Sequence, residues 1–302
     1  MTSWLRRLSD ALGRDPIYGI LLVLPLTVWV FATLIYPLAE AIRLSLLDVG
    51  YVGMPGRFVG LRNYAGTLSD SEFIRSTRIT LLWTVLNTVG IVIAGFIAAL
   101  VLNQDYRGKV FIRNWIILPW VFPSVVLATL GKWVLDPTLG LANYLLIQVG
   151  IIDRGISFLG SPTQAIYMTA ALNVWRWFPF FTVIFLAALQ TVPREQHESA
   201  EIDGATRFAR LIHIDVPSIA PVMKVAVLIS SLWSINIFDL IWLLTRGGPA
   251  FSTTTLPIFI YLKGFQEFRI SLAAAAAVIM FVALVVYGVI YVRRLLAEDL
   301  EV

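Results

Sequence analysis

Six apolar windows succeed one another along the chain, at about residues 17–47, 80–103, 113–135, 163–192, 218–245 and 271–292. A membrane-spanning helix needs about 20 mostly apolar residues, and every window reaches that length. The pattern therefore predicts an all-α membrane protein with six transmembrane helices within residues 17–292. Pro25 and Pro37 lie inside the first window, so we expect that helix to be kinked or tilted. The Gly, Asp and Ser residues of 48–79 and 136–162 predict loops there.

The segment before the first window, residues 1–16, is a candidate N-terminal helix. Its apolar residues recur at helical spacing, opposite the charged ones: Trp4, Leu5, Leu8 and Leu12. This spacing suits a short helix lying on the membrane surface, and a solvated tail is the alternative. The window at 17–47 is too long for the apolar part of a signal peptide and lacks a small-residue cleavage site. We therefore expect it to be a retained first span.

Composition supports a lipid environment and removes several kinds of chemistry. The chain is 58% hydrophobic and 14% charged, with a mean hydropathy of +0.81, which is more apolar surface than one soluble core can bury. It has no cysteine and two isolated histidines, His197 and His213, so disulfides, metal sites and a cofactor bound by this chain are not expected. The net charge of +4 comes from scattered residues, which argues against a nucleic-acid partner.

Lys and Arg are unevenly distributed over the connecting segments. Eleven fall in the segments 1–16, 104–113, 191–217 and 293–302, and eight in the longer segments 48–79, 136–162 and 246–270. Cytoplasmic loops of membrane proteins carry an excess of positive charge. The distribution predicts that both termini, the loop at 193–217 and a tail at 293–302 lie in the cytoplasm.

The loop at 193–217 is too long and too ordered in composition to be a simple turn. Its acidic residues Glu198, Glu201 and Asp203 would favour the first turns of a helix through the helix dipole. Gly204 can end that helix, and a second helix can begin near Phe208. The residues alone predict a helix-turn-helix under the membrane with one face free for a soluble partner.

The spacing within this loop resembles the EAA loop of ABC importer permeases, which reads E-A-A, three residues, G, nine residues, I, one residue, L-P. Glu198-Ser199-Ala200, Gly204, Ile214 and Val216-Pro217 occupy those places. Ser199 and Val216 depart from the usual Ala and Leu. The resemblance implies a type I ABC importer permease, in which this loop forms a coupling helix seated on a cytoplasmic ATPase. The implied ATPase-coupling residues are Glu198, Ser199, Ala200, Asp203, Gly204, Ile214 and Pro217.

Two further stretches are similar to the sugar-importer branch of that family, of the maltose-permease and glycerol-phosphate-permease type. They are Ile117-Leu118-Pro119-Trp120-Val121-Phe122-Pro123-Ser124, after Arg107-Gly108-Lys109, and Leu243-Leu244-Thr245-Arg246-Gly247-Gly248-Pro249. The Gly-Gly-Pro turn is typical of the maltose-F-like member of a permease pair.

This branch implies a multi-pass protein of a bacterial or archaeal inner membrane. Its implied partners are a second homologous permease, a cytoplasmic ATPase dimer and a periplasmic or lipid-anchored solute-binding protein. The ATPase dimer would bind the ATP and Mg, because this chain has no phosphate-binding G-x-x-x-x-G-K-[ST] run. The chain itself is therefore not expected to be an enzyme.

The resemblance also implies a set of residues along the substrate path, most of them polar or aromatic. They are Trp120, Ser124, Arg176, Trp177, Phe180, Ser230, Ser234, Asn236, Ile237 and Asp239. Aromatic faces that stack on a sugar ring, with hydroxyl and amide groups around them, are what a saccharide pocket needs. Ile237 stands where the family has Asn, which argues against a plain maltose site.

Arg176 stands out because a guanidinium keeps its proton and needs an anion inside a membrane. Either Asp239 or a residue of the partner permease supplies that anion, or the arginine contacts a sugar-like solute that carries an anionic group. An ion-coupled secondary transporter is the first alternative function, with Asp239 and Glu40 as its acidic candidates. An intramembrane enzyme is the second, but both histidines lie in the cytoplasmic loop.

Overall fold

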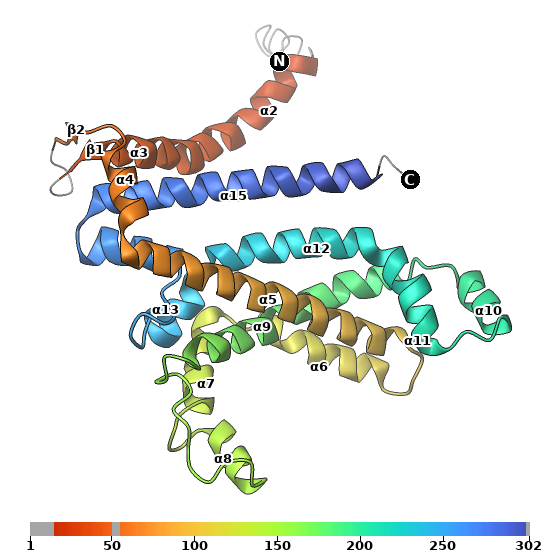
Figure 1. Ribbon diagram of the computed structural model, residues 1–302. Coiled ribbons are helices and arrows are strands. Elements are labelled where there is room, and N and C mark those ends of the chain that lie inside the picture. Colours follow the sequence, from red (N-terminus) through yellow and green to blue (C-terminus); the bar gives the residue numbers. More distant parts are fainter. Residues whose placement is uncertain (1–14, 50–54, 300–302) are drawn as a thin grey trace, which may run out of the picture. The chain divides into compact units, whose positions relative to one another are not determined.

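The computed structural model describes residues 15–49 and 55–299 (Figure 1). These residues contain five helices long and apolar enough to cross a membrane, and a bent helix pair provides a sixth crossing if it is counted as one. The predicted all-α membrane class is confirmed, and the six predicted windows correspond to these five helices and the bent pair. Most of the predicted surface helix at 1–16 lies outside the described residues. The chain divides into two compact units, formed by residues 1–67 with 263–279 and by residues 68–262 with 280–302.

The first unit holds the first span and a small ribbon. Its elements are α2 (Asp15–Val30), the π-helical turn η1 (Phe31–Ile35), α3 (Tyr36–Ser45), β1 (Leu47–Asp48), β2 (Arg57–Phe58), most of α4 (Arg62–Ser69), η3 (Leu262–Gln266) and the first residues of α15 (Ile270–Asp299). The expected irregularity in the first span takes the form of η1, which ends two residues before Pro37, a residue that cannot donate a helical hydrogen bond. Asn63 Nδ2 donates to the carbonyls of Ser45 and Leu47 at 2.8 Å, which fixes α4 to the ribbon.

The second unit carries the rest of the bundle. Its elements are α5 (Ser71–Asn103), α6 (Lys109–Val121), α7 (Ser124–Val134), α8 (Leu141–Gln148), α9 (Ala165–Leu189), α10 (Arg194–Ile202), α11 (Arg207–Arg210), η2 (Leu211–Asp215), α12 (Val216–Asn236), α13 (Asp239–Thr245), α14 (Leu256–Tyr261) and the remainder of α15. Helices α5, α9 and α12 pack side by side (Figure 1). Ile91, Phe181, Phe185 and Ile219 are buried between them and form the main core.

Helix α5 begins at Ser71, nine residues before the predicted span, so part of the predicted loop at 48–79 is helical. The Asp70 side chain caps this helix by accepting a hydrogen bond from the amide of Glu72 at 2.8 Å. Phe73 and Ser76 are buried although their neighbours are polar. A hydropathy window cannot detect such a polar first turn. In a similar way α15 continues past the predicted end at residue 292 to Asp299.

The third predicted span is broken. Helices α6 and α7 meet at an angle of 100°, and Phe122 between them has extended backbone angles. Pro123 explains the break, because a proline disfavours helical geometry in the residue before it and has no amide hydrogen to donate. Helix α7 therefore leaves the direction of α6 instead of extending it.

The fifth predicted span, at 218–245, is also displaced. The helical run starts at Arg207 and ends at Asn236, and α13 follows as a separate helix after the extended Ile237. No proline or glycine marks this break in the sequence.

The predicted loop at 136–162 contains α8. The buried Asn143 fixes this helix through hydrogen bonds of 2.8 to 3.0 Å to Asp136 and Ile156.

Candidate functional site

Residues 194–215 form two helices joined by a tight turn at the ends of α9 and α12 (Figure 1). Gly204 adopts a left-handed φ of +75°. The amide of Gly204 donates to the Glu201 carbonyl at 3.0 Å, and the amide of Ala205 donates to the Ala200 carbonyl at 2.9 Å. This pair of bonds is a Schellman ending, in which glycine is the preferred left-handed residue. The predicted helix-turn-helix is confirmed, and we refer to residues 194–215 as the hairpin.

The acidic residues of the hairpin do not lie where the dipole argument placed them. Helix α10 begins at Arg194, directly after Pro193, so Glu195 occupies its first turn. Glu198 lies in the middle of the helix, Glu201 in the last turn and Asp203 at the C-terminal cap. The prediction that these three stabilise the start of the helix was therefore wrong. Proline readily precedes a helix, and here it moves the start about one turn upstream.

The outer surface of the hairpin is polar with two large apolar side chains. Glu198, Ser199, Asp203, Gly204 and Pro217 are exposed, whereas Ala200 and Ile214 are half-buried. Ile202 is 87% exposed and Phe208 is 70% exposed. Sequence reasoning missed these two as site residues. Their signal in the sequence was a large apolar residue in an otherwise charged loop.

Arg176 of α9 meets residues from two other helices. Its Nη1 donates a hydrogen bond of 2.6 Å to Ser124 Oγ at the start of α7 and lies 3.9 Å from Asp239 Oδ2 at the start of α13. Its guanidinium carbon lies 5.3 Å from the centre of the Trp177 ring, within cation–π range. The Arg176 side chain is 16% exposed and that of Asp239 is 55% exposed. The structure thus brings four of the predicted path residues together.

The aromatic path residues pack on one another. Trp120 of α6 lies 5.5 Å from Phe180 of α9, between ring centres. Trp233 of α12 lies 5.4 Å from Phe180 and 5.1 Å from Trp177. Trp120 is 43% exposed, so one end of this row is open. The row joins α6, α9 and α12 beside Arg176.

Ser230, Ser234 and Ile237 meet Trp177 around a cavity of about 10 Å³, which is room for one water molecule at most. Asn173 also lines this cavity, and sequence reasoning did not select it. Its Nδ2 donates to Asn87 Oδ1 at 2.6 Å, while its Oδ1 is buried and has no partner among the described residues. A fully buried amide inside an apolar span was the signal that could have found it.

Asn236 does not join the other predicted path residues around this cavity. Its side chain is exposed, and its Nδ2 donates to the carbonyl of Leu232 in its own helix at 2.8 Å. In this conformation Asn236 helps to end α12.

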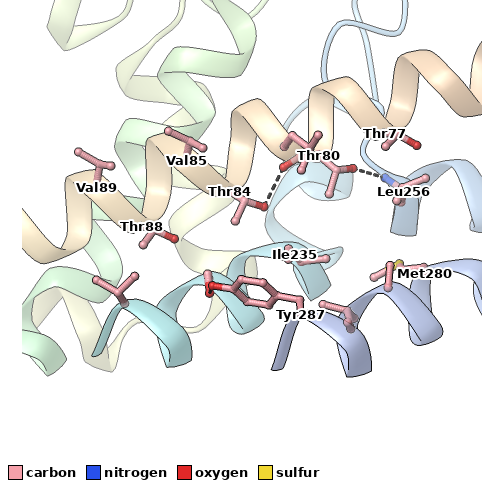
Figure 2. Close-up of a pocket in the computed structure, with 15 residues that line it drawn as sticks. Thr77, Thr80, Thr84, Val85, Thr88, Val89, Ile235, Leu256, Met280 and Tyr287 are labelled. Carbon is pink, nitrogen blue, oxygen red and sulfur yellow. Dashed lines mark hydrogen bonds between the residues drawn. The ribbon is translucent and has the colours of Figure 1, made fainter. Parts of the chain in front are cut away.

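A larger groove of about 440 Å³ lies between α5, α12, Leu256 and the middle of α15, from Met280 to Tyr287 (Figure 2). Most of the threonine hydroxyls that line it are bonded to the protein. Thr80 Oγ1 donates to the Ser76 carbonyl and accepts from the amide of Leu256, and Thr84 Oγ1 donates to the Thr80 carbonyl. Thr88 is the exception, with a buried hydroxyl that has no partner among the described residues. The groove therefore offers few hydrogen-bonding groups, which makes it a poor saccharide site.

The groups needed by the alternative functions are not assembled within residues 15–49 and 55–299. No group of three or more His, Asp and Glu side chains there could hold a metal ion. Glu40 is bonded to Arg43 through two hydrogen bonds of 2.6 and 2.8 Å. This leaves Glu40 poorly placed to bind a coupling ion.

Comparison with known proteins identifies relatives over nearly the whole chain. The family model described as binding-protein-dependent transport system inner membrane component matches residues 91–297. The trehalose/maltose transport system permease protein MalF of Thermococcus litoralis is 32% identical, over 93% of this chain and 94% of that protein. The sulfoquinovosyl glycerol transport system permease protein SmoG of Agrobacterium fabrum is 28% identical, over 94% of this chain and 92% of that protein.

A solved structure shares the fold. The crystal structure of a bacterial ABC transporter involved in the import of the acidic polysaccharide alginate contains a chain that superimposes with a TM-score of 0.81. That chain is 25% identical, and the match covers 96% of this chain and 98% of that one.

Proposed function

Because the chain belongs to the family of binding-protein-dependent transport system inner membrane components, we propose that it forms half of the translocation path of an ATP-driven importer. It is a multi-pass transport subunit of the inner membrane and not an enzyme. The other half of the path is a second homologous permease, and a solute-binding protein delivers the solute. A cytoplasmic ATPase dimer, which binds ATP and Mg, drives the cycle.

The observation that carries this proposal is the position of the hairpin relative to the path. The hairpin continues without interruption into α12, the helix that carries Ser230 and Ser234. Its outer surface presents Glu198, Ile202 and Phe208 to solvent. A charged and apolar surface of this kind suits a soluble partner. A force applied there by the ATPase would act directly on a helix that lines the path.

The solute is a sugar-like molecule that carries an anionic group. Trp177 supplies an aromatic face, and Arg176 beside it supplies a cation whose Nε is buried and lacks a partner among the described residues. Asp239 lies 3.9 Å away and is more than half exposed, so it compensates the charge of Arg176 only weakly. An oxyanion of the solute could accept from the guanidinium bidentately. Relatives named for sulfoquinovosyl glycerol and for the acidic polysaccharide alginate support this class.

Reconstitution of the complete complex in lipid vesicles tests the proposal. We expect uptake of an acidic sugar only when the second permease, the ATPase, ATP and the binding protein are all present. The single subunit should move no solute. Uptake by the subunit alone, or uptake driven by an ion gradient without ATP, would show that it is not half of an ATP-driven path. Uptake of a neutral disaccharide in preference to acidic analogues would refute the solute class alone.

A further inference from the structure

Two side chains on one face of α10 reach across the hairpin to the segment that leads into α12. His197 and Glu201 are four residues apart, so they lie on the same side of their helix. His197 Nε2 lies 3.3 Å from Asp215 Oδ1, and Glu201 pairs with Arg210. The side chains of Asp215 and Arg210 are only 14% and 16% exposed. Both residues on the α12 side are therefore shielded beneath α10.

The two partners are spaced five residues apart, which does not suit a regular helix. At about 100° per residue, positions 210 and 215 would point about 140° away from each other. The segment between them is the π-helical turn η2, Leu211–Asp215. A π-turn holds one extra residue per turn and so rotates the two positions toward each other. Positions 210 and 215 can then face positions 201 and 197 on α10.

The helix beyond this turn runs without a break from Asp215 to the candidate path. Ser230 lies fifteen positions further along α12, which is about 22 Å at 1.5 Å per residue. The helix is continuous over this distance, with Pro221 in its first turns, so a displacement of Asp215 is transmitted toward the wall of the small cavity at Ser230. By contrast, the connection from α10 back to α9 passes through the short non-helical segment before Arg194.

We propose that the pairs His197–Asp215 and Glu201–Arg210 are a brace that makes α10 and α12 move as one body during transport. The four residues are positioning residues, since they lie in the hairpin and act on the path only through α12. The inference rests on the proposed function, because it assumes that the ATPase acts on the hairpin. The brace adds a route by which motion of the hairpin reaches the substrate path. It also gives η2 a role, which is to turn positions 210 and 215 toward α10.

Charge exchange in the complete complex tests the brace. The variants are Glu201→Arg, Arg210→Glu and the double exchange, each purified with the second permease, the ATPase and the binding protein. The readout is the amount of solute transported per ATP hydrolysed in vesicles. Each single variant should lower this ratio by up to about fivefold, the upper end of what a partly exposed pair contributes. The double exchange should restore it to within about twofold, because the ion pair is re-formed.

His197→Ala and Asp215→Ala test the second pair in the same assay, and each should also lower the ratio. Gln196→Ala is the control, because Gln196 is exposed on α10 and carries no charge that could take part in an ion pair. A merely structural defect would remove the ATPase from the purified complex, so its retention is measured in each preparation. Unchanged ratios in the single variants, or no recovery in an assembled double exchange, would overturn the brace.

The brace and the proposed function fail in different ways. If the hairpin does not contact the ATPase, Gly204→Asp leaves transport normal. The proposed coupling of the hairpin to the ATPase is then wrong. If the hairpin does contact the ATPase but the brace is wrong, Gly204→Asp abolishes transport while the four brace variants keep the wild-type ratio.

Discussion

Arg176 donates a hydrogen bond of 2.6 Å to the hydroxyl of Ser124. The bond joins α9 to the first residue of α7, directly after the break at Pro123. A hydroxyl is a neutral partner, so this contact leaves the charge of the guanidinium uncompensated. The bond therefore holds the arginine in place, with the carboxylate of Asp239 3.9 Å from the same nitrogen.

The first prediction concerns this arginine. Arg176→Ala should depress transport of an acidic sugar strongly, since losing a buried contact to a charged group costs about 2–5 kcal/mol. Arg176→Lys should restore transport only in part, because an ammonium lacks the planar fork of the guanidinium. Uptake in vesicles containing the complete complex measures both effects, with assembly checked by co-purification.

A purely structural ion pair makes the opposite prediction. In that case Asp239 would be left unpaired in Arg176→Ala, and the double variant Arg176→Ala, Asp239→Ala would recover transport. We expect no such recovery, because the Asp239 carboxylate is 3.9 Å away and 55% exposed. Recovery in the double variant would assign Arg176 to structure.

The second prediction concerns Gly204. Asp and Asn both adopt the left-handed conformation that this position requires, so the backbone cost of the two substitutions is similar. A Cβ atom at position 204 would meet no atom beyond its neighbouring residues within 4 Å. Gly204→Asp should therefore insert and fold but fail to transport, because it places a negative charge in the contact with the ATPase. Gly204→Asn should retain more activity, and equal activity of the two would argue against a contact there.

The third prediction concerns the two exposed apolar residues of the hairpin. Ile202→Ser and Phe208→Ser should each weaken binding of the ATPase by about 10- to 100-fold, since burying such a side chain contributes about 1.5–3 kcal/mol. The stability of the isolated subunit should not change, because both side chains are exposed. Binding of the purified ATPase to the subunit in nanodiscs measures the effect. Wild-type affinity in both variants would place the ATPase contact elsewhere.

The apolar windows were sufficient to predict the number of spans and the fold class, because burial in lipid demands long apolar helices whatever their packing. The turn at Gly204 was predictable for a local reason, since few other residues adopt its backbone angle. The bend between α6 and α7 had a visible cause in Pro123. These features depend on composition or on single residues.

The features that sequence reasoning missed depend on contacts between distant segments. The break after Asn236 has no proline or glycine, and Trp83 Nε1 of α5 donates to the carbonyl of Ser234 near that helix end. The polar first turns of α5 are helical because Phe73 and Ser76 are buried. The pairing of Asn173 with Asn87 joins positions 86 residues apart. None of these contacts can be read from one stretch of the chain.

The fourth prediction concerns that buried amide pair. Asn87→Leu removes the acceptor for Asn173 Nδ2 and leaves a second polar group of Asn173 unpaired, which should cost about 1–3 kcal/mol. The double variant Asn87→Leu, Asn173→Leu replaces both amides by apolar groups and should be more stable than the two single losses predict. Thermal unfolding of the four proteins in detergent provides the comparison. Strict additivity would mean that the two amides do not depend on each other.

The last prediction concerns the segment that leads into α8. Asp136 Oδ1 accepts hydrogen bonds from the amide of Leu139 at 2.9 Å and from the hydroxyl and amide of Thr138 at 2.7 and 2.8 Å. These bonds lower the pKa of the Asp136 carboxyl below its ordinary value, and the bond from the Leu139 amide has the largest effect. The backbone of Gly155 packs closely on this segment, because a Cβ atom at that position would lie 2.0 Å from the Pro137 carbonyl oxygen.

A carboxyl whose pKa is lowered by folding stabilises the folded form above its unfolded pKa, about 3.9 for Asp. That contribution is lost as the pH falls through the lower pKa of the folded form. Hydrogen exchange of the amides in 138–156 should therefore be slow and constant at neutral pH, after correction for intrinsic rates, and should accelerate below about pH 4. Asp136→Asn is the matched control, because its amide oxygen can accept the same bonds but does not titrate. Its protection should be weaker at neutral pH and should not change over the acidic range, so an identical acid dependence in both proteins would exclude Asp136 as the titrating group.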